Sequence, residues 1–408
     1  MQFANDSGKI IKALIPKFDD CQPKRFSSPT FKKNLSKLTD ILYNNIEKGE
    51  KYVEEKIMNK CFGAKILNKE EIVIPKGYNS HFFPEYIRKY IDDTCTNQLV
   101  YSCPIAGHPI RIRVMLFNNE ALEDLDRYVK FMYIWLYICY QNSETNCSKK
   151  LDIYLYFTPF KKTLPNRNTE ILNVKHVNTA FTYQCVPHGE IVIYREEEWM
   201  KVFIHETFHS FGLDIDRHSE NIIKDEIKNI FPIDCDFAVG EAYTETWARI
   251  INCAFTSYNA MKIAKNNKKD FNIFMMFCLQ VERMFSIEQM NKMLNFMGLT
   301  YETLYKNGEI NTYLRNNLYR ENSSVFAYYI LTGLFMNNFY EFMLWCQTNN
   351  LSLFKYHRTQ KNINSFKDLI DSLYKDNTLL KSLKCRAFKG KKQDILIKTT
   401  RMSVVEFT

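Results

Sequence analysis

The chain has 408 residues, of which 46% are hydrophobic and 25% are charged, and its formal net charge is +9. These proportions are typical of a globular protein and exclude wholesale disorder. The positive charge alone is compatible with nucleic-acid binding. However, the lysines are scattered along the chain and form no module with interleaved aromatic residues, so we do not expect nucleic acid as a partner.

The twelve cysteines include no CxxC pair. Several lie inside apolar stretches, which favours buried free thiols over a disulfide framework and therefore a reducing, cytoplasmic compartment. The first ten residues lack the apolar core of a signal peptide. The longest apolar segments, residues 131–140 and 325–336, are too short to span a bilayer. We therefore expect a soluble intracellular protein with no membrane partner.

In chain order, the first 95 residues are expected to form mainly helical segments that prolines separate. Alternating apolar residues and flanking turn residues then predict strands. The extended segments are expected at 99–103, 110–117, 151–157, 174–183 and 190–194. Between the second and third of these, apolar residues recur at helical spacing from residue 120 onward, with Asn119 as the expected N-cap.

A strong helix is predicted at 196–211. Its three N-terminal glutamates suit the positive end of a helix dipole, and Gly212 is the expected terminator. Helical periodicity dominates the remainder of the chain, with helices expected at 237–255, 271–285, 287–296 and 325–347. The predicted fold class is therefore α+β, with a mixed sheet followed by a mainly helical C-terminal lobe.

The same elements suggest four parts of the chain. Residues 1–95 are a mainly helical segment whose role the sequence does not reveal, and residues 96–212 form the lobe that carries the sheet. Residues 213–380 form the helical lobe. Residues 381–408 are a basic tail, which contains the densest run of lysine and arginine and is expected to be solvated rather than bound to a partner.

His205-Glu206-Thr207-Phe208-His209 is an HExxH motif within the predicted helix 196–211. Residues four apart share a helix face, so both imidazoles can bind one ion, and neutral imidazole nitrogen is a good Zn²⁺ ligand. Glu206 is offset from that face. Its carboxylate can act as general base toward a water whose pKa zinc lowers to about 7. The simpler alternative is a hydrogen-bonded pair of core histidines without a metal.

A catalytic zinc usually has three protein ligands and one open position. Asp214, Asp216 and His218 follow the motif closely, but none fits a spacing that we can justify. Glu241 is favoured because it lies in a predicted helix with apolar neighbours. Glu245, one turn later, can then accept the outer N–H of a ligand histidine. The alternative is that both are surface glutamates of an amphipathic helix. The sequence therefore predicts one zinc ion with Glu241 as its third ligand.

HExxH followed by a helix with an ExxxD/E pair resembles the gluzincin class of zinc peptidases, to which thermolysin belongs. Gluzincins carry an asparagine-alanine edge strand just before the active-site helix, and Asn178-Thr179-Ala180-Phe181 lies in the equivalent place. The resemblance covers residues 99–255 and implies a zincin-like lobe in which Asn178 and Ala180 contact the main chain of a peptide substrate. The spacing from His209 to Glu241 is longer than is usual in the class, which implies an inserted loop.

The amino-acid bias of the chain is also similar to that of metallopeptidases from large DNA viruses, which would imply a virus-encoded protein in the host cytoplasm or the virion. Gluzincin-like sites further use a tyrosine or histidine from the C-terminal lobe to stabilise the tetrahedral intermediate. Tyr328 is expected in this role, ahead of Tyr329 and Tyr243, because it follows a helix start that Ser323 or Ser324 can cap. Packing is the alternative role for any one of these tyrosines.

The sequence thus predicts a zinc-dependent peptidase that acts on peptides or proteins. An endopeptidase is favoured over an exopeptidase, because no acidic motif lies beside Asn178 to hold a free amine. Two alternatives come from other classes of protein. One is a structural or interaction protein that binds zinc without turnover, against which the intact Glu206 counts. The other is a nucleic-acid-associated protein that uses its basic surface.

Overall fold

The computed structural model describes residues 3–18, 22–117, 124–144, 146–265, 267–384 and 395–406. The fold class is α+β, with 59% helix and 12% strand, as the sequence predicts. The chain forms two compact units. We call residues 41–161 and 178–213 the sheet unit, and residues 1–40, 162–177 and 214–408 the helical unit. Within the described ranges, no helix combines the length and the apolar character needed to cross a membrane.

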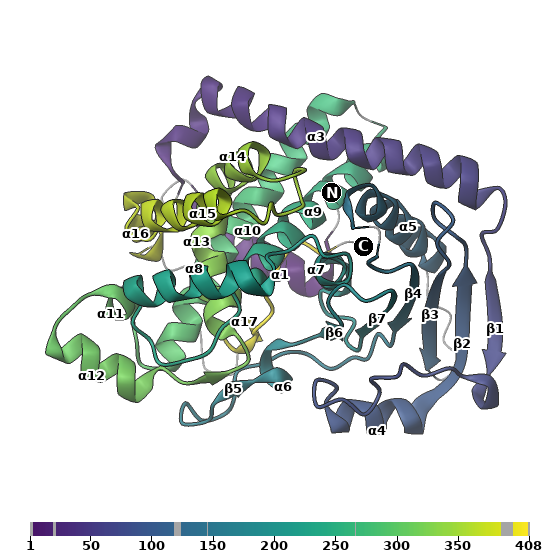
Figure 1. Ribbon diagram of the computed structural model, residues 1–408, viewed down its shortest axis with the longest axis horizontal. Helices are drawn as coiled ribbons and strands as arrows, with labels where there is room; N and C mark the ends of the chain where they lie inside the picture. Colours follow the sequence, from purple (N-terminus) through teal and green to yellow (C-terminus); the bar gives the residue numbers. More distant parts are fainter. Residues whose placement is uncertain are drawn as a thin grey trace. The chain divides into compact units, whose positions relative to one another are not determined.

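The sheet unit is built on a six-stranded mixed sheet with the order β1-β2-β3-β4-β7-β6 (Figure 1). The first three strands pair antiparallel, β3, β4 and β7 pair parallel, and β6 returns antiparallel to β7 at the edge. The strands are β1 (Ala64–Asn68), β2 (Cys95–Ser102), β3 (Ile110–Phe117), β4 (Lys150–Leu155), β6 (Ala180–Thr182) and β7 (His188–Ile193). The strand predicted at 174–183 is wrong in its first half, because α6 (Val174–Val177) is helical.

Helices cover both faces of this sheet. One face packs against α4 (Glu85–Thr94) through a cluster of buried apolar and aromatic side chains that includes Ile87, Tyr154 and Val192. Side chains alternate along a strand, so Gly189 of β7 points to the opposite face. There a Cβ at Gly189 would lie 3.1 Å from Ser210 in α7 (Trp199–Ser210). Helix α7 packs against β7 and against α5 (Leu125–Asn142) on this face.

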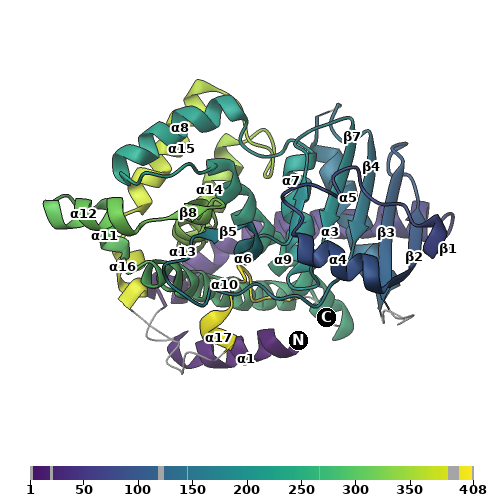
Figure 2. The same cartoon turned by 90° about the horizontal axis from the view of Figure 1, so that it is seen from below.

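The helical unit centres on two long helices, α9 (Val239–Ile263) and α10 (Lys268–Phe296), which pack side by side (Figures 1 and 2). Two shorter helices were expected in place of α10. The single helix expected at 325–347 is instead three pieces, namely the π-helix η5 (Phe326–Leu331), α13 (Thr332–Asn337) and α14 (Phe339–Asn349). The other principal helices are α8 (Arg217–Ile230), α11 (Tyr301–Tyr305), α12 (Glu309–Leu318), α15 (Gln360–Leu373) and α16 (Asn377–Lys384).

The first 95 residues divide between the two units. Helix α1 (Asn5–Leu14) belongs to the helical unit, whereas β1 and α4 belong to the sheet unit. Helix α3 (Pro29–Val53) contains the division, which falls after Asp40. This part of the chain is therefore mainly helical, as expected, but it also supplies an edge strand of the sheet that the sequence pattern did not reveal.

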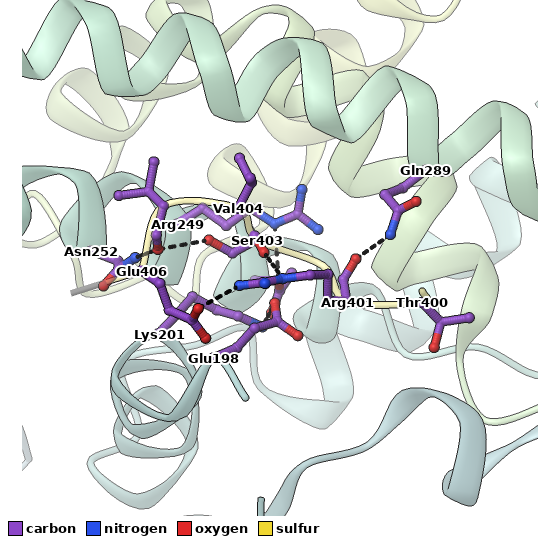
Figure 3. Close-up of polar contacts among 12 residues, drawn as sticks. Glu198, Lys201, Arg249, Asn252, Gln289, Thr400, Arg401, Ser403, Val404 and Glu406 are labelled. Atoms are coloured by element: carbon purple, nitrogen blue, oxygen red, sulfur yellow. Dashed lines mark hydrogen bonds and ion pairs between the residues drawn. The ribbon is translucent and has the colours of Figure 1, made fainter. Parts of the chain in front are cut away.

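The C-terminal part of the chain differs from the expected solvated tail. Residues 385–394, which hold most of the basic run, lie outside the described residues. The segment that follows is buried from Thr399 to Val405. Figure 3 shows it among the side chains that bind it, including Asn252, which donates to the Val405 carbonyl at 2.6 Å. Its backbone N–H groups at Val404 and Val405 donate to one carboxylate oxygen of Glu282.

The cysteines are mostly free thiols, as expected. Eight unpaired cysteines are found among the described residues, and six of them are buried. The exception is a disulfide between Cys147 and Cys185, which are 38 residues apart. The described cysteines therefore form no disulfide framework, as expected, but they include this one disulfide.

Candidate active site

The HExxH motif lies on α7, which is buried almost throughout its length. The preceding residue Glu198 has a positive φ of 61°, so the three predicted first-turn glutamates come just before the helix and not within it. Gly212 ends the helix as predicted, with a φ of +61°. Near the middle of the helix, the Trp135 indole of α5 donates to the Thr207 hydroxyl at 2.6 Å. This contact ties the motif to the core of the sheet unit.

The two motif histidines present the same ring nitrogen to one point. The Nε2 atoms of His205 and His209 are 3.2 Å apart. Two ligands bound at about 2.0–2.1 Å to one tetrahedral ion lie roughly 3.3 Å apart, so this spacing suits a shared metal. His205 is only 6% exposed and Glu206 only 8% exposed. The side chains are therefore largely withdrawn from water, where electrostatic interactions are stronger.

Glu241 lies in the first turn of α9 and is partly buried. His205, His209 and Glu241 form one of the groups among the described residues that could hold a metal ion. Two neutral imidazoles and one carboxylate are also a ligand set that catalytic zinc sites use.

Tyr328 of η5 is the tyrosine that meets this ligand set. Its hydroxyl donates to Glu241 Oε2 at 2.9 Å. The other two candidates are occupied in the interior. The Tyr243 hydroxyl donates to the Phe354 carbonyl at 2.8 Å and accepts from Asn350 at 2.7 Å. The Tyr329 hydroxyl donates to the Thr400 carbonyl. Tyr328 is therefore the tyrosine whose hydroxyl binds the predicted ligand Glu241.

Glu245 is buried one turn after Glu241, and Arg249 Nε donates to its carboxylate at 3.0 Å. Both side chains are about 1% exposed, so this is a buried ion pair. The Arg249 guanidinium also donates to the Ser286 hydroxyl of α10. The alternative that Glu245 is a surface glutamate is therefore excluded, whereas its predicted contact with a ligand histidine stays a prediction.

The predicted substrate-binding residues lie at the edge of the sheet. Ala180 of β6 pairs with Ile193 of β7, and β6 is the last strand in the described sheet. Asn178 precedes this strand, and its carbonyl oxygen accepts a hydrogen bond from Arg195 Nε at 3.2 Å. Arg195 in turn donates to the Tyr86 hydroxyl at 3.0 Å. The structure therefore brings both residues to an edge strand and adds Arg195, a buried partner that the sequence analysis did not identify.

The remaining candidate ligands have other surroundings. Asp216 is the N-cap of α8 and accepts from the backbone N–H groups of His218 and Ser219. His218 itself is exposed. A second group of potential ligands, Glu144 with the two disulfide cysteines, also lies within 4.8 Å. Because its two sulfurs are bonded to each other, it offers no thiolate pair to a metal.

Sequence reasoning missed two features near the candidate site. The helix that carries Tyr328 is capped by Glu321, and not by Ser323 or Ser324 as expected, since the Glu321 carboxylate accepts from the Val325 and Phe326 N–H groups. The disulfide lies beside the end of α7, where Cys185 N–H donates to the His209 carbonyl at 3.0 Å. A glutamate four or five residues before the capped N–H groups was the available signal for the first feature, and the sequence held none for the second.

Comparisons with known proteins add no family to this geometry: no protein-family model, no curated protein and no solved structure matches the chain.

Proposed function

We propose that this chain is a zinc-dependent peptidase in which His205, His209 and Glu241 bind the metal and Glu206 is the general base. The observation that carries the proposal is that the Nε2 atoms of His205 and His209 lie 3.2 Å apart within a group of residues that could hold a metal ion. When bound, zinc supplies Lewis acidity toward a carbonyl oxygen and toward water. This proposal accounts for two histidines that present the same ring nitrogen to one point, beside a buried glutamate.

The side chains of the motif have distinct tasks in this proposal. Glu206 takes a proton from the attacking water and passes it to the leaving amine, a role for which its offset from the two histidines on α7 leaves it available. When substrate is bound, the single O–H of Tyr328 turns from Glu241 to the oxygen that becomes negative in the tetrahedral intermediate. Its hydroxyl is 2.9 Å from a Glu241 oxygen, which supports a place beside the metal. The substrate is a peptide or protein whose main chain lies along the edge strand β6.

A structural zinc site is the less favoured assignment. Such sites are normally closed by four protein ligands, whereas catalytic sites use three and keep one position open. The group found among the described residues has three members, and a further carboxylate follows the first histidine directly. This composition favours catalysis over a purely structural role.

The test is a comparison of the wild-type protein with Glu206→Gln. Zinc content is measured after dialysis, and hydrolysis of a mixed peptide library is followed with and without a chelator. We expect both proteins to hold about one zinc per chain, while the substitution lowers turnover by at least about 100-fold, as expected for loss of a general base. Full zinc with no chelator-sensitive hydrolysis in the wild type would instead identify a zinc-binding protein without turnover. Absence of zinc would overturn the proposal.

We also propose a reducing compartment for this protein. Eight unpaired cysteines among the described residues support it, since an oxidising compartment favours pairing. The Cys147–Cys185 disulfide is the opposing observation. Thiol titration of the protein purified from cells under alkylating conditions tests the proposal, which expects free thiols at the eight positions and fails if they are largely oxidised.

A further inference from the structure

Glu321 makes an unusual concentration of contacts within the helical unit. It lies in the short strand β8 (Glu321–Asn322), which pairs in parallel with β5 (Leu172–Asn173). Four donors converge on its carboxylate. They are the Val325 N–H, the Phe326 N–H at 2.9 Å, the Tyr319 hydroxyl at 2.8 Å and the Cys235 thiol at 3.4 Å.

These contacts fix the start of η5. The first N–H groups of a helix have no partner within the helix, and a carboxylate placed there satisfies them and interacts favourably with the helix dipole. Glu321 binds two of them, at Val325 and Phe326. The Phe326 ring is also packed between aromatic neighbours, with Phe237 at 4.7 Å and Phe231 at 5.4 Å between ring centroids. The first turn of η5 is therefore held by its backbone and by a side chain.

The wider turn of η5 sets the direction of Tyr328. A π-helix contains more residues per turn than an α-helix, so it rotates the side chains that follow it, and such turns are frequent at functional sites. Here Thr332 Oγ1 donates to the Ala327 carbonyl five residues earlier, at 2.9 Å, which stabilises the wide turn. Tyr328 lies two positions after Phe326, whose N–H donates to Glu321. The Tyr328 hydroxyl donates to Glu241 Oε2 at 2.9 Å.

We infer that Glu321 is a positioning residue that acts through η5 and Tyr328 to orient the Glu241 carboxylate for metal binding. This inference rests on the proposed function, because it assigns Glu241 to the metal. The Tyr328 hydroxyl donates to Oε2 of Glu241 and thereby restrains the orientation of the carboxylate. Hydrogen-bonding partners of metal ligands that orient them in this way typically contribute 10–100-fold to metal affinity.

Glutamine at position 321 changes this arrangement with little change in size. One carboxylate oxygen becomes an NH₂ donor, which then faces the donors that the carboxylate accepted. The first turn of η5 loses an acceptor, and Tyr328 loses its fixed distance from Glu241. Glu309, in the first turn of α12 in the same unit, is a matched control because it is exposed and has no contact with η5 among those described.

The experiment measures zinc affinity by competition with a chromophoric chelator for four proteins in addition to the wild type, namely Glu321→Gln, Tyr328→Phe, the double variant and Glu309→Gln. We expect each of the first two to weaken zinc binding by about 10–100-fold. The zinc affinity of the double variant should equal that of the more strongly affected single variant, because both changes interrupt one chain of contacts. Glu309→Gln should bind zinc like the wild type.

The outcomes separate this inference from the proposed function. Absence of zinc in the wild type overturns the proposed function itself. Zinc binding in the wild type with single variants within twofold of it, or with effects that multiply in the double variant, overturns the role of Glu321 alone. A single variant with a lower melting temperature but unchanged zinc affinity would also overturn the role of Glu321 alone. If Glu321→Gln does not fold, Glu321→Asp replaces it, since the shorter side chain retains the charge but withdraws it from the two N–H groups.

Discussion

Helices α7 and α9 each carry two polar residues four positions apart, and they use this spacing differently. In α7, the Nε2 atoms of His205 and His209 meet 3.2 Å apart. In α9, Glu241 accepts from the Tyr328 hydroxyl, whereas Glu245 pairs with the Arg249 guanidinium. The i, i+4 spacing therefore places two groups on one face, but their neighbours decide whether they act together. Pairing with Arg249 engages Glu245, and Glu241 is the carboxylate that we propose as a metal ligand.

The largest expected effect is loss of zinc from α7. Replacing His205 or His209 by alanine removes one of three ligands, so each variant should retain almost no zinc after dialysis, as measured by elemental analysis. His218→Ala, an exposed position on α8, is the control and should keep the wild-type content. If both motif variants retained zinc, the ion would be bound elsewhere, and α7 would hold no metal, like α9.

The second effect concerns Glu245. Removing one partner of a buried ion pair leaves the other charge uncompensated and typically costs about 3–5 kcal/mol. We expect Glu245→Ala to lower the free energy of unfolding by that amount in a urea titration. Glu302→Ala breaks the exposed pair with Lys306 at the same i, i+4 spacing and should change stability little. Equal effects of the two substitutions would contradict the assignment of Glu245 to the core.

Glu241 should behave differently from Glu245 in a zinc titration. Loss of a direct ligand exceeds the roughly 10–100-fold effect of a ligand's partner. We therefore expect Glu241→Ala to weaken zinc binding by more than about 100-fold, while the melting temperature of the zinc-free protein changes little because Glu241 is only partly buried. A greater loss of zinc affinity in Glu245→Ala than in Glu241→Ala would reverse the roles of the two glutamates.

The smallest effect concerns the anchor of α7. Trp135→Phe retains the apolar packing but removes the indole donor to Thr207, and a neutral hydrogen bond typically contributes about 0.5–1.5 kcal/mol. We expect a loss of about 1 kcal/mol in unfolding free energy with unchanged zinc stoichiometry. A large loss of zinc instead would show that the position of the motif depends on this one contact.

The sequence predicts these two helices for a clear physical reason. Helix α7 is bounded by a terminating glycine and carries a motif with fixed spacing, and α9 has apolar neighbours around Glu241. Where the prediction was wrong, the local signal was weak or misleading. Strand β1 is mostly exposed at the sheet edge, so it shows no apolar alternation. Two helices were expected on either side of Ser286, but α10 is continuous there and the Ser286 hydroxyl donates to the Glu282 carbonyl within the helix.

Other features of the candidate site need tertiary structure and lie beyond local patterns. The disulfide joins cysteines 38 residues apart. The contact of Tyr328 with Glu241 spans 87 residues and was not predicted; the resemblance to gluzincins implied only a role for Tyr328 toward the tetrahedral intermediate. The Glu321 carboxylate accepts hydrogen bonds from a thiol and a hydroxyl that approach from separate segments. Sequence periodicity gives the face of an element but not which distant face it will meet.

The central claim is that one zinc ion is bound by side chains of both α7 and α9. The most direct test is a crystal structure of the purified protein with anomalous diffraction measured on both sides of the zinc absorption edge. We expect one peak about 2.0–2.2 Å from Nε2 of His205, Nε2 of His209 and an oxygen of Glu241. A protein with no peak there, or with its zinc bound by other residues, would contradict the claim.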